Sequence, residues 1–482
     1  MNRRVFLQAM GTAILAGRLV SAAAAANPPD EEPRDDAPMP QTVRFRVFWT
    51  WDHSTTWALN RPGGHDFGAS NDYGRTPETF VADYTCLLRW AGRHGIDAVV
   101  VWGLLRDRHG GVEVAKRLCD VAHESGVKLL AGVGLNAYGG VYYEGDSPWS
   151  LENHLKAHPD LYGLRSPDGP PMIYDFGLAG AKPTHHACPS RPENQDFAQE
   201  SLRWLFETLP LDGVQMETGD TGVCQCRLCQ ERRRYPVSGF SLEDMALMYP
   251  LAADAIRSVR PEATIIAETY SHPEPYSGPA AAPDFGQGAP PWLAECVAAF
   301  PERIMVNWVC DAFVAPRNER PWTDAGRPPA GGDRLHIMRA HFGTFWHRYR
   351  DELCIDWISD MVTKSLAHGF GGISIFGESS PFHTGSELNY LAFADYGSEA
   401  NPDADVHSFL QRVAAPLLGG PDLAEEYLRI ARLIDKREEI PAALRRIRQI
   451  AATLDGRPAE RWTWLANFLA SFIYPEPPID AA

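Results

Sequence analysis

The chain has 482 residues, of which 44% are hydrophobic, so it can bury the core of one large domain with long loops and a small appendage. Its formal net charge of −17 leaves no concentrated surface of Lys and Arg to displace counterions from phosphates, which argues against a nucleic-acid partner.

The first 26 residues have the three parts of an export signal. Arg3 and Arg4 form a positive start, residues 9–20 are apolar, and residues 22–26 are alanines that suit signal cleavage. Paired arginines resemble the twin-arginine class, so we expect a periplasmic or secreted protein. The apolar run is too short and too interrupted to span a bilayer, and no stable membrane insertion is expected after cleavage.

Residues 42–403 alternate between strand and helix patterns, after a linker over residues 27–41 whose Pro, Asp and Glu content predicts disorder. The expected strands are residues 44–49, 97–102, 128–133, 213–217, 263–268, 303–308, 335–338 and 372–378. The expected helices are residues 77–94, 112–125, 195–209, 241–260 and 356–368. This order favours an α/β fold of the (β/α)8 TIM-barrel type over a doubly wound sheet, which has fewer strands.

Three segments depart from the regular alternation. Residues 136–192 form an unusually long loop, and residues 314–332 are rich in Pro, Gly, Arg and Asp, so a loop replaces the helix expected there. Residues 404–482 carry amphipathic patterns that predict a C-terminal helical region packed on the barrel.

Polar residues and tryptophans follow the expected strands, where a (β/α)8 barrel carries its reacting groups. Sugars suit such a cleft, because their C–H faces pack on aromatic rings and their hydroxyls need fixed acceptors. We therefore predict a carbohydrate partner. The residues predicted to bind it are Trp51, Asp52, Asn136, Glu268, Trp308, Asp311 and His341.

Glu217 is the predicted proton donor, because it ends the fourth expected strand, where burial raises the pKa of a carboxyl group. Its alternative role is that of a carboxylate that binds substrate or braces the loop. Asp220 lies three residues further on and has two open roles, since it either takes part in catalysis or caps its turn through the amides of Gly222 or Val223.

Glycosidic cleavage needs one protonated and one ionised carboxyl group. The partner acid is Glu268, Asp311 or Glu378, and the predicted catalytic set is Glu217, Asp220 and Glu378. The chain contains no glycine-rich phosphate loop, no Gly-x-Ser-x-Gly and no His-Glu-x-x-His, which argues against phosphoryl transfer, serine-esterase and zincin chemistry.

Three cysteines with the spacing Cys-x-Cys-x2-Cys follow the fourth expected strand. They are Cys224, Cys226 and Cys229. Three thiolates supply three corners of a tetrahedral zinc site, and Cys188, His185 or His186 supplies the fourth; the predicted set uses Cys188. A disulfide with one spare thiol is the alternative. A cysteine-rich metal site is closed and structural, so we expect no cofactor in the reaction itself.

Several of these segments together resemble a known group of proteins. They are FWTWD at 48–52, ACPSRPEN at 187–194, LDGVQME at 211–217, the three-cysteine motif and Gly377-Glu378. The chain is similar to the TIM-barrel glycoside-hydrolase-like proteins exported by bacteria, which are distantly related to alpha-glucuronidases and beta-hexosaminidases. The resemblance implies that the strand-four carboxylate, Glu217, is the acid/base. Met216 stands where hexosaminidases carry an Asp beside that Glu.

Together these features predict an exported glycoside hydrolase that cleaves an oligosaccharide or polysaccharide fragment with strand-end carboxylates. Two alternatives remain: a barrel that binds carbohydrate without cleaving it, and a metal-thiolate protein of another function whose cleft is incidental.

Overall fold

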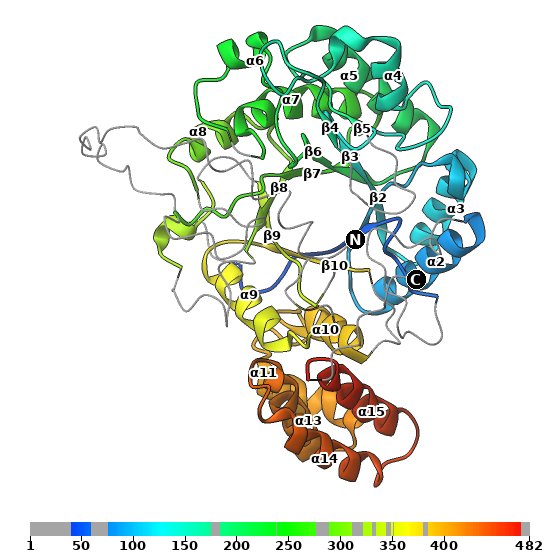
Figure 1. The fold of residues 1–482 in the computed structure, drawn as a ribbon, viewed down its shortest axis with the longest axis vertical. Helices are drawn as coiled ribbons and strands as arrows, with labels where there is room; N and C mark the ends of the chain where they lie inside the picture. The colour runs from blue at the N-terminus through cyan, green and yellow to red at the C-terminus, as the bar shows by residue number, and fades with distance from the viewer. Residues whose placement is uncertain are drawn as a thin grey trace, which may run out of the picture. The chain divides into compact units, whose positions relative to one another are not determined.

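Eight parallel strands close into a barrel in the order β1-β10-β9-β8-β7-β6-β3-β2, with helices arranged around it (Figure 1). The computed structural model describes residues 40–58, 76–174, 184–237, 239–275, 289–310, 322–329, 334–343, 349, 351–378 and 384–473. The barrel strands are β1 (Phe45–Trp51), β2 (Ala98–Trp102), β3 (Lys128–Gly134), β6 (Gly213–Glu217), β7 (Thr264–Glu268), β8 (Met305–Val309), β9 (Leu335–Ala340) and β10 (Gly372–Phe376). The predicted (β/α)8 fold is confirmed.

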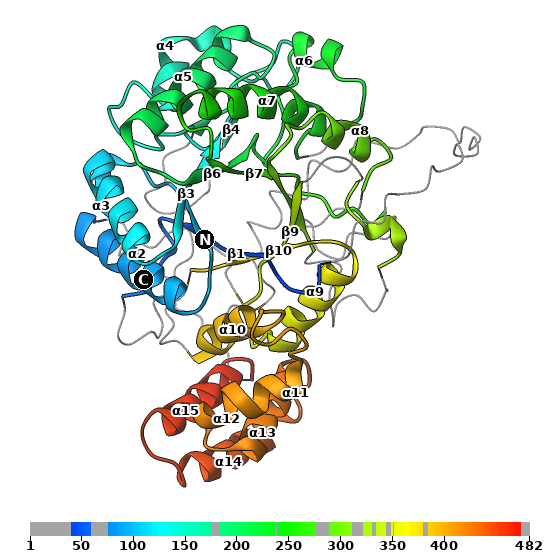
Figure 2. The same ribbon diagram turned by 180° about the vertical axis from the view of Figure 1, so that it is seen from behind.

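Helices follow most of the strands along the chain. They are α2 (Pro77–Arg93), α3 (Gly111–Glu124), α5 (Pro192–Thr208), α6 (Arg227–Arg232), α7 (Leu242–Val259), α8 (Leu293–Ala298), α9 (Ile355–Ala367) and α10 (Thr384–Asp395). Of these, α2, α3, α5, α7 and α9 correspond to the five predicted helices, while α6, α8 and α10 were not predicted. In the described part of the segment between β8 and β9, residues 322–329, there is a short 3-10 turn at Asp324–Gly326. Figure 2 shows the same ring of strands and helices from behind.

The long loop predicted over residues 136–192 carries more structure than its sequence suggested. It contains the helix α4 (Leu151–Ala157) and a two-stranded antiparallel sheet formed by β4 (Ile173–Tyr174) and β5 (Thr184–His185). These elements are too short to show a hydrophobic period, which explains why the pattern missed them.

Ser241 caps the N-terminus of α7, because its side chain accepts the amide hydrogen of Asp244. The carboxylate of Asp244 binds Arg232 and Arg233, with Arg233 Nε at 2.9 Å. These ion pairs fix the segment after α6 to the start of α7.

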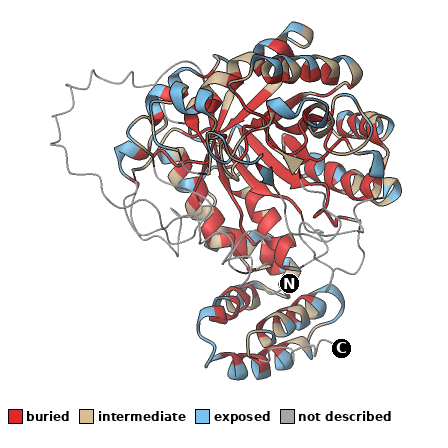
Figure 3. Ribbon diagram, turned by 45° about the horizontal axis from the view of Figure 1, so that its top comes forward, coloured by how far each residue is buried: buried red, intermediate tan, exposed pale blue. Residues whose placement is uncertain are grey.

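Successive strand residues face opposite sides of the barrel wall. On β6, Val214 and Met216 belong to the outer core between strands and helices, while Gln215 and Glu217 face the barrel interior. The barrel strands are buried except at the first residue of β3, β7, β8 and β9, whereas the helices show buried and exposed faces (Figure 3). Side chains at the carboxyl ends of the strands therefore meet at one rim.

Five further helices complete the described chain. They are α11 (Val406–Phe409), α12 (Ala415–Leu418), α13 (Pro421–Ala431), α14 (Ile440–Ala451) and α15 (Gly456–Ala470). Arg461 on α15 binds Glu387 on α10 through two hydrogen bonds of 2.8 and 2.9 Å. Arg432 pairs with Asp356 on α9 at 2.9 Å. Among the described residues, the helices are all too short or too polar to cross a membrane.

Gly132 on β3 leaves room for the indole of Trp102 on β2, because any Cβ at this position would collide with that ring. We predict that Gly132→Ala lowers the free energy of unfolding by about 1–3 kcal/mol, measured by urea denaturation. The same substitution in a Trp102→Ala background removes the collision and should cost much less. An equal cost in both backgrounds would contradict this packing.

Candidate active site

Two carboxyl groups lie at the carboxyl end of β6, each bound by a tyrosine from a neighbouring loop. Tyr270, two residues after β7, donates its hydroxyl hydrogen to Glu217 Oε2. Tyr138, four residues after β3, donates its hydroxyl hydrogen to Asp220 Oδ1. Because β3 and β7 are the two strands that flank β6, the tyrosines reach the acids from both sides.

Both tyrosines have left-handed backbone conformations, with φ of 55° for Tyr138 and 53° for Tyr270. A residue other than glycine pays about 1–3 kcal/mol for such a conformation, and this strain is typical of functional sites. Gly219, with φ of 101°, makes the turn that brings Asp220 back beside Glu217. A Cβ at this glycine would lie 2.9 Å from the Ala137 side chain, so the turn packs closely on the β3 loop.

The two acids do not have equal proton affinity. Burial raises the pKa of Glu217 well above its usual value, and the negative charges of Asp220 and Glu268 raise it further, against the opposing effect of Arg339. The pKa of Asp220 is also raised by burial and by the charge of Glu268, but the hydrogen bond from Tyr138 and the charge of Arg339 limit this rise. The proton therefore stays on Glu217 more readily than on Asp220.

The predicted role of Asp220 as a cap through Gly222 is not what holds this turn. The Gly222 amide donates to the Gly239 carbonyl at 2.8 Å, and Asp220 accepts from Tyr138.

Glu268 lies beside this pair as a carboxylate whose oxygens are occupied by protein donors. Oε1 accepts the amide hydrogens of Thr269 and Tyr270 at 3.0 and 2.9 Å. Oε2 accepts from Asn307 at 2.6 Å and from Gln215 at 3.4 Å, and Arg339 Nη2 lies 3.3 Å away. A carboxylate so fully bound is poorly placed to attack a sugar, and its charge acts on Glu217 from a fixed position.

Asp52, directly after β1, is a second anion that the protein holds by its own donors. Arg106 Nε lies 2.6 Å from Oδ2, and His109 and His53 lie 3.1 and 3.2 Å from its two oxygens. Burial alone would raise the pKa of Asp52, but Arg106, His109 and His53 outweigh burial and hold it well below the usual value. These contacts make Asp52 a brace of the rim.

Aromatic rings line the rim on the side of β1 and β2. Trp51 lies 5.6 Å from Trp102, 5.8 Å from Tyr138 and 6.1 Å from Tyr143, measured between ring centroids. The Tyr143 hydroxyl is buried without a hydrogen-bond partner among the described residues. Burial is the main cause that raises the pKa of this phenol, and the Glu217 charge raises it further. We call Trp51, Trp102, Tyr138 and Tyr143 the aromatic wall.

Three other predicted residues lie at the same rim. Asn136 follows β3, and its buried Oδ1 has no hydrogen-bond partner in the described part of the chain. His341 follows β9 and lies edge-on to Trp49 at 5.3 Å. Glu378 follows β10 and is fully buried. Asp311 lies outside the described residues.

Trp308 is not brought to the rim. Its ring belongs to the outer core between strands and helices, and its Nε1 donates to His336 Nδ1 at 3.1 Å. Even-numbered residues of β8 face outward here, so a tryptophan that ends an apolar strand need not reach the interior.

Several rim residues were missed by the sequence analysis. They are Tyr138, Tyr143, Tyr270, Arg106, His109, Asn307 and Arg339. Arg339 had a usable signal, because a charged residue inside a buried strand needs a partner. The tyrosines had none, since their role depends on which loops meet in space.

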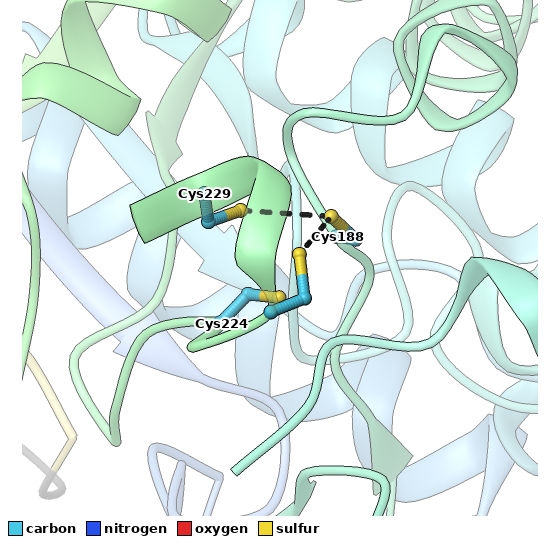
Figure 4. A group of neighbouring side chains, drawn as sticks. Cys188, Cys224 and Cys229 are labelled. Carbon is cyan, nitrogen blue, oxygen red and sulfur yellow. Dashed lines mark hydrogen bonds between the residues drawn. The ribbon is translucent and has the colours of Figure 1, made fainter. Parts of the chain in front are cut away.

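The four predicted cysteines come together outside the barrel rim (Figure 4). The sulfurs of Cys188, Cys224, Cys226 and Cys229 all lie within 4.8 Å of one another. Cys188 Sγ is 3.5 Å from Cys226 Sγ and 3.6 Å from Cys229 Sγ, far beyond the ~2.05 Å of a disulfide. This cluster could hold a structural metal. The two histidines that were considered for the fourth position form hydrogen bonds to other residues, His185 to Glu152 and His186 to Thr221.

Comparison with known family models and with curated protein sequences finds no match. Solved structures match in fold. A GH138 enzyme targeting pectin rhamnogalacturonan II aligns with a TM-score of 0.51 and 11% identity over 90% of this chain and 57% of that one. An O-GlcNAc hydrolase variant from Thermobaculum terrenum aligns with a TM-score of 0.49 and 12% identity over 90% of this chain and 83% of that one. At 11% identity, the likeness to the GH138 enzyme shows the barrel fold alone.

Asp52→Asn should lower the free energy of unfolding by about 3–5 kcal/mol, because it leaves the Arg106 charge without its buried partner. The stabilisation by Asp52 is complete above the ordinary Asp pKa of ~3.9 and is lost as the pH falls through the depressed pKa of the folded state. The matched control is Asp168→Asn at an exposed pair with Arg227, where about 0.5 kcal/mol or less is expected. Urea denaturation from pH 3 to 8 checks both, and a small loss at Asp52 would contradict the bracing role.

Glu217→Gln should stabilise the fold increasingly as the pH rises. The raised pKa means that the folded protein keeps a proton that the unfolded chain loses. Above the unfolded pKa of ~4.3, the free energy of unfolding of the wild type therefore falls by up to about 1.4 kcal/mol per pH unit. Glutamine cannot ionise and avoids this loss. Thermal unfolding at pH 5 and pH 8 measures the difference, with Glu113→Gln, at an 83% exposed side chain, as control. A gain that is the same at both pH values would contradict the shifted pKa.

Proposed function

We propose that this protein is a glycoside hydrolase that cleaves glycosidic bonds in an oligosaccharide or polysaccharide fragment. The observation that carries the proposal is the pair of acids at the end of β6, buried Glu217 and half-buried Asp220, each bound by its own tyrosine. Glycoside hydrolysis needs one protonated and one ionised carboxyl group, and the environments of these two acids favour that division.

In the proposed reaction Glu217 gives its proton to the oxygen of the leaving sugar as the bond from that oxygen to the anomeric carbon breaks. Over the full cycle a water molecule forms the new bond to that carbon, and the proton that it loses restores the protonated Glu217. The Tyr270 hydroxyl holds the Glu217 carboxyl group in place, and the desolvated site keeps the proton on Glu217 at neutral pH. Asp220 in its ionised form balances the positive charge that develops on the sugar ring. Glu378 is the second candidate for this ionised partner, because it lies at the end of β10 on the same rim.

The aromatic wall supports a carbohydrate substrate. The rings of Trp51 and Trp102 offer flat apolar surfaces, while Asn136 and Tyr143 present buried polar atoms that have no hydrogen-bond partner among the described residues. Sugars combine C–H faces with hydroxyl groups and match both features.

The remaining expectations accompany this proposal. The N-terminal sequence supports export through a twin-arginine-type signal to the periplasm or beyond. We also propose that the barrel over residues 42–403 and the helical region over residues 404–482 fold as one unit. We propose that the reaction uses no cofactor and that the cysteine cluster serves structure, since four thiolates leave no open metal position.

A panel of aryl glycosides, uronic acids included, tests the proposal with Glu217→Gln as the variant. Loss of a general acid should lower kcat/KM about 10²–10⁴-fold, and the loss should be largest for leaving groups of high pKa, because these need protonation most. Glu113→Gln is the matched control and should leave kcat/KM unchanged, since its side chain is exposed.

Two outcomes would contradict the proposal. Turnover unaffected by Glu217→Gln would remove the residue from catalysis. Sugar binding without any turnover by the wild type across the panel would favour the alternative of a barrel that binds carbohydrate without cleaving it.

A further inference from the structure

We propose that Cys188, Cys224, Cys226 and Cys229 bind one zinc ion as four thiolates, and that this ion fixes the turn that carries Asp220. The ion would join two segments that are separate in the chain: the residues before α5, and the continuous stretch from the loop after β6 into helix α6. Only the catalytic role of Asp220 rests on the proposed function.

The sulfur separations fit a single tetrahedral ion. Zinc bound by four thiolates at ~2.3 Å places neighbouring sulfurs about 3.8 Å apart. The separations of 3.5 and 3.6 Å around Cys188 Sγ lie close to this value, and all four sulfurs stay within 4.8 Å of one another. A [4Fe–4S] cluster binds each cysteine to a different iron and a [2Fe–2S] cluster binds two cysteines to each of two irons, so both need wider spacing than a single ion. Four soft ligands in tetrahedral array around one ion favour zinc.

The cluster takes the place of a hydrophobic core in this region. Cys188, Cys224 and Cys229 are at most 3% exposed, and with half-buried Cys226 they form a packing cluster that includes no other apolar side chain of the described residues. Four buried thiols alone give little apolar surface, so a metal ion is the natural source of cohesion here.

Donors around the sulfurs suit thiolates. The amide of Leu164 donates to Cys224 Sγ at 3.3 Å, and the Ser190 hydroxyl lies 3.1 Å from Cys229 Sγ. Arg232 donates to Ser190 at 2.9 Å, and Arg233 donates to the Cys224 carbonyl at 2.6 Å. Together with Asp244, which binds both, the two guanidinium groups carry a net charge of +1 and offset part of the net charge of −2 that one Zn²⁺ and four thiolates carry.

The link to the rim is short. Asp220 precedes Cys224 by four residues, and Thr221 Oγ1 lies 3.1 Å from His186 Nε2, two residues before Cys188. On the far side of the cluster, the Gln225 amide donates to the Leu164 carbonyl at 2.7 Å. The turn over residues 218–223 is thus anchored at one end by β6 and at the other by the cysteines. Removal of the ion should release the second anchor.

Elemental analysis of the purified full chain tests the zinc ion directly. We expect about one zinc per chain in the wild type, a loss of at least half of the zinc in Cys226→Ser, and no change in Cys86→Ser, a matched half-buried cysteine of α2. Exchange with cobalt should give the charge-transfer and visible bands of a tetrahedral thiolate site. Iron in place of zinc, or nine free thiols and no metal in the native wild type, would overturn the assignment.

Hydrogen–deuterium exchange tests the anchoring role and needs no substrate. After zinc is removed by a chelator, amides of residues 218–233 and 184–191 should exchange at least ~10-fold faster, while β2 and β3 keep their protection. Unchanged exchange over residues 218–223 in zinc-free protein would overturn the link to Asp220. A protein that binds zinc and shows this change, but hydrolyses no glycoside, would refute the proposed function and leave this inference standing.

Discussion

The structure depends on one electrostatic constraint: buried Glu217 and half-buried Asp220 lie together at the end of β6, and among the described residues no cation forms an ion pair with either. Desolvation disfavours the charge of both, and the nearby anion Glu268 disfavours the charge of Glu217 further. Arg339 favours the charge of both acids, but it pairs with Glu268. Two phenol hydroxyls, from Tyr138 and Tyr270, solvate the acids in place of water. The barrel supplies this burial because every strand end meets at the same rim.

The acids of the rim show how neighbours assign different roles to one functional group. Asp52 has an arginine and two histidines and stays ionised as a brace. Glu268 has five protein donors and acts as a fixed charge. Glu217 has one phenol donor, and burial raises its pKa well above the usual value. This environment favours a proton on the carboxyl group, as an acid that must deliver one requires, whereas the neighbours of Asp52 hold that carboxyl group ionised.

Much of this arrangement could be predicted from the sequence. Strand positions followed from short apolar runs, and the carboxyl ends of parallel strands must converge, so Glu217, Glu268 and Glu378 were correctly placed at one rim. The cysteine spacing also indicated a cluster around Cys188. The facing direction of a strand residue was harder: Trp308 ends an apolar strand, where both faces are buried and the period of two is hidden. The tyrosines could not be found, because their contacts join loops that only the closed barrel brings together.

Direct observation of the Glu217 proton tests the account most sharply. Infrared difference spectroscopy of the wild type against Glu217→Gln detects the C=O stretch of a protonated carboxylic acid. The account predicts that this band is present at pH 7 in the wild type, absent in the variant, and lost only well above the ordinary Glu pKa of ~4.3. A carboxyl group at position 217 that titrates near that ordinary value would contradict the account.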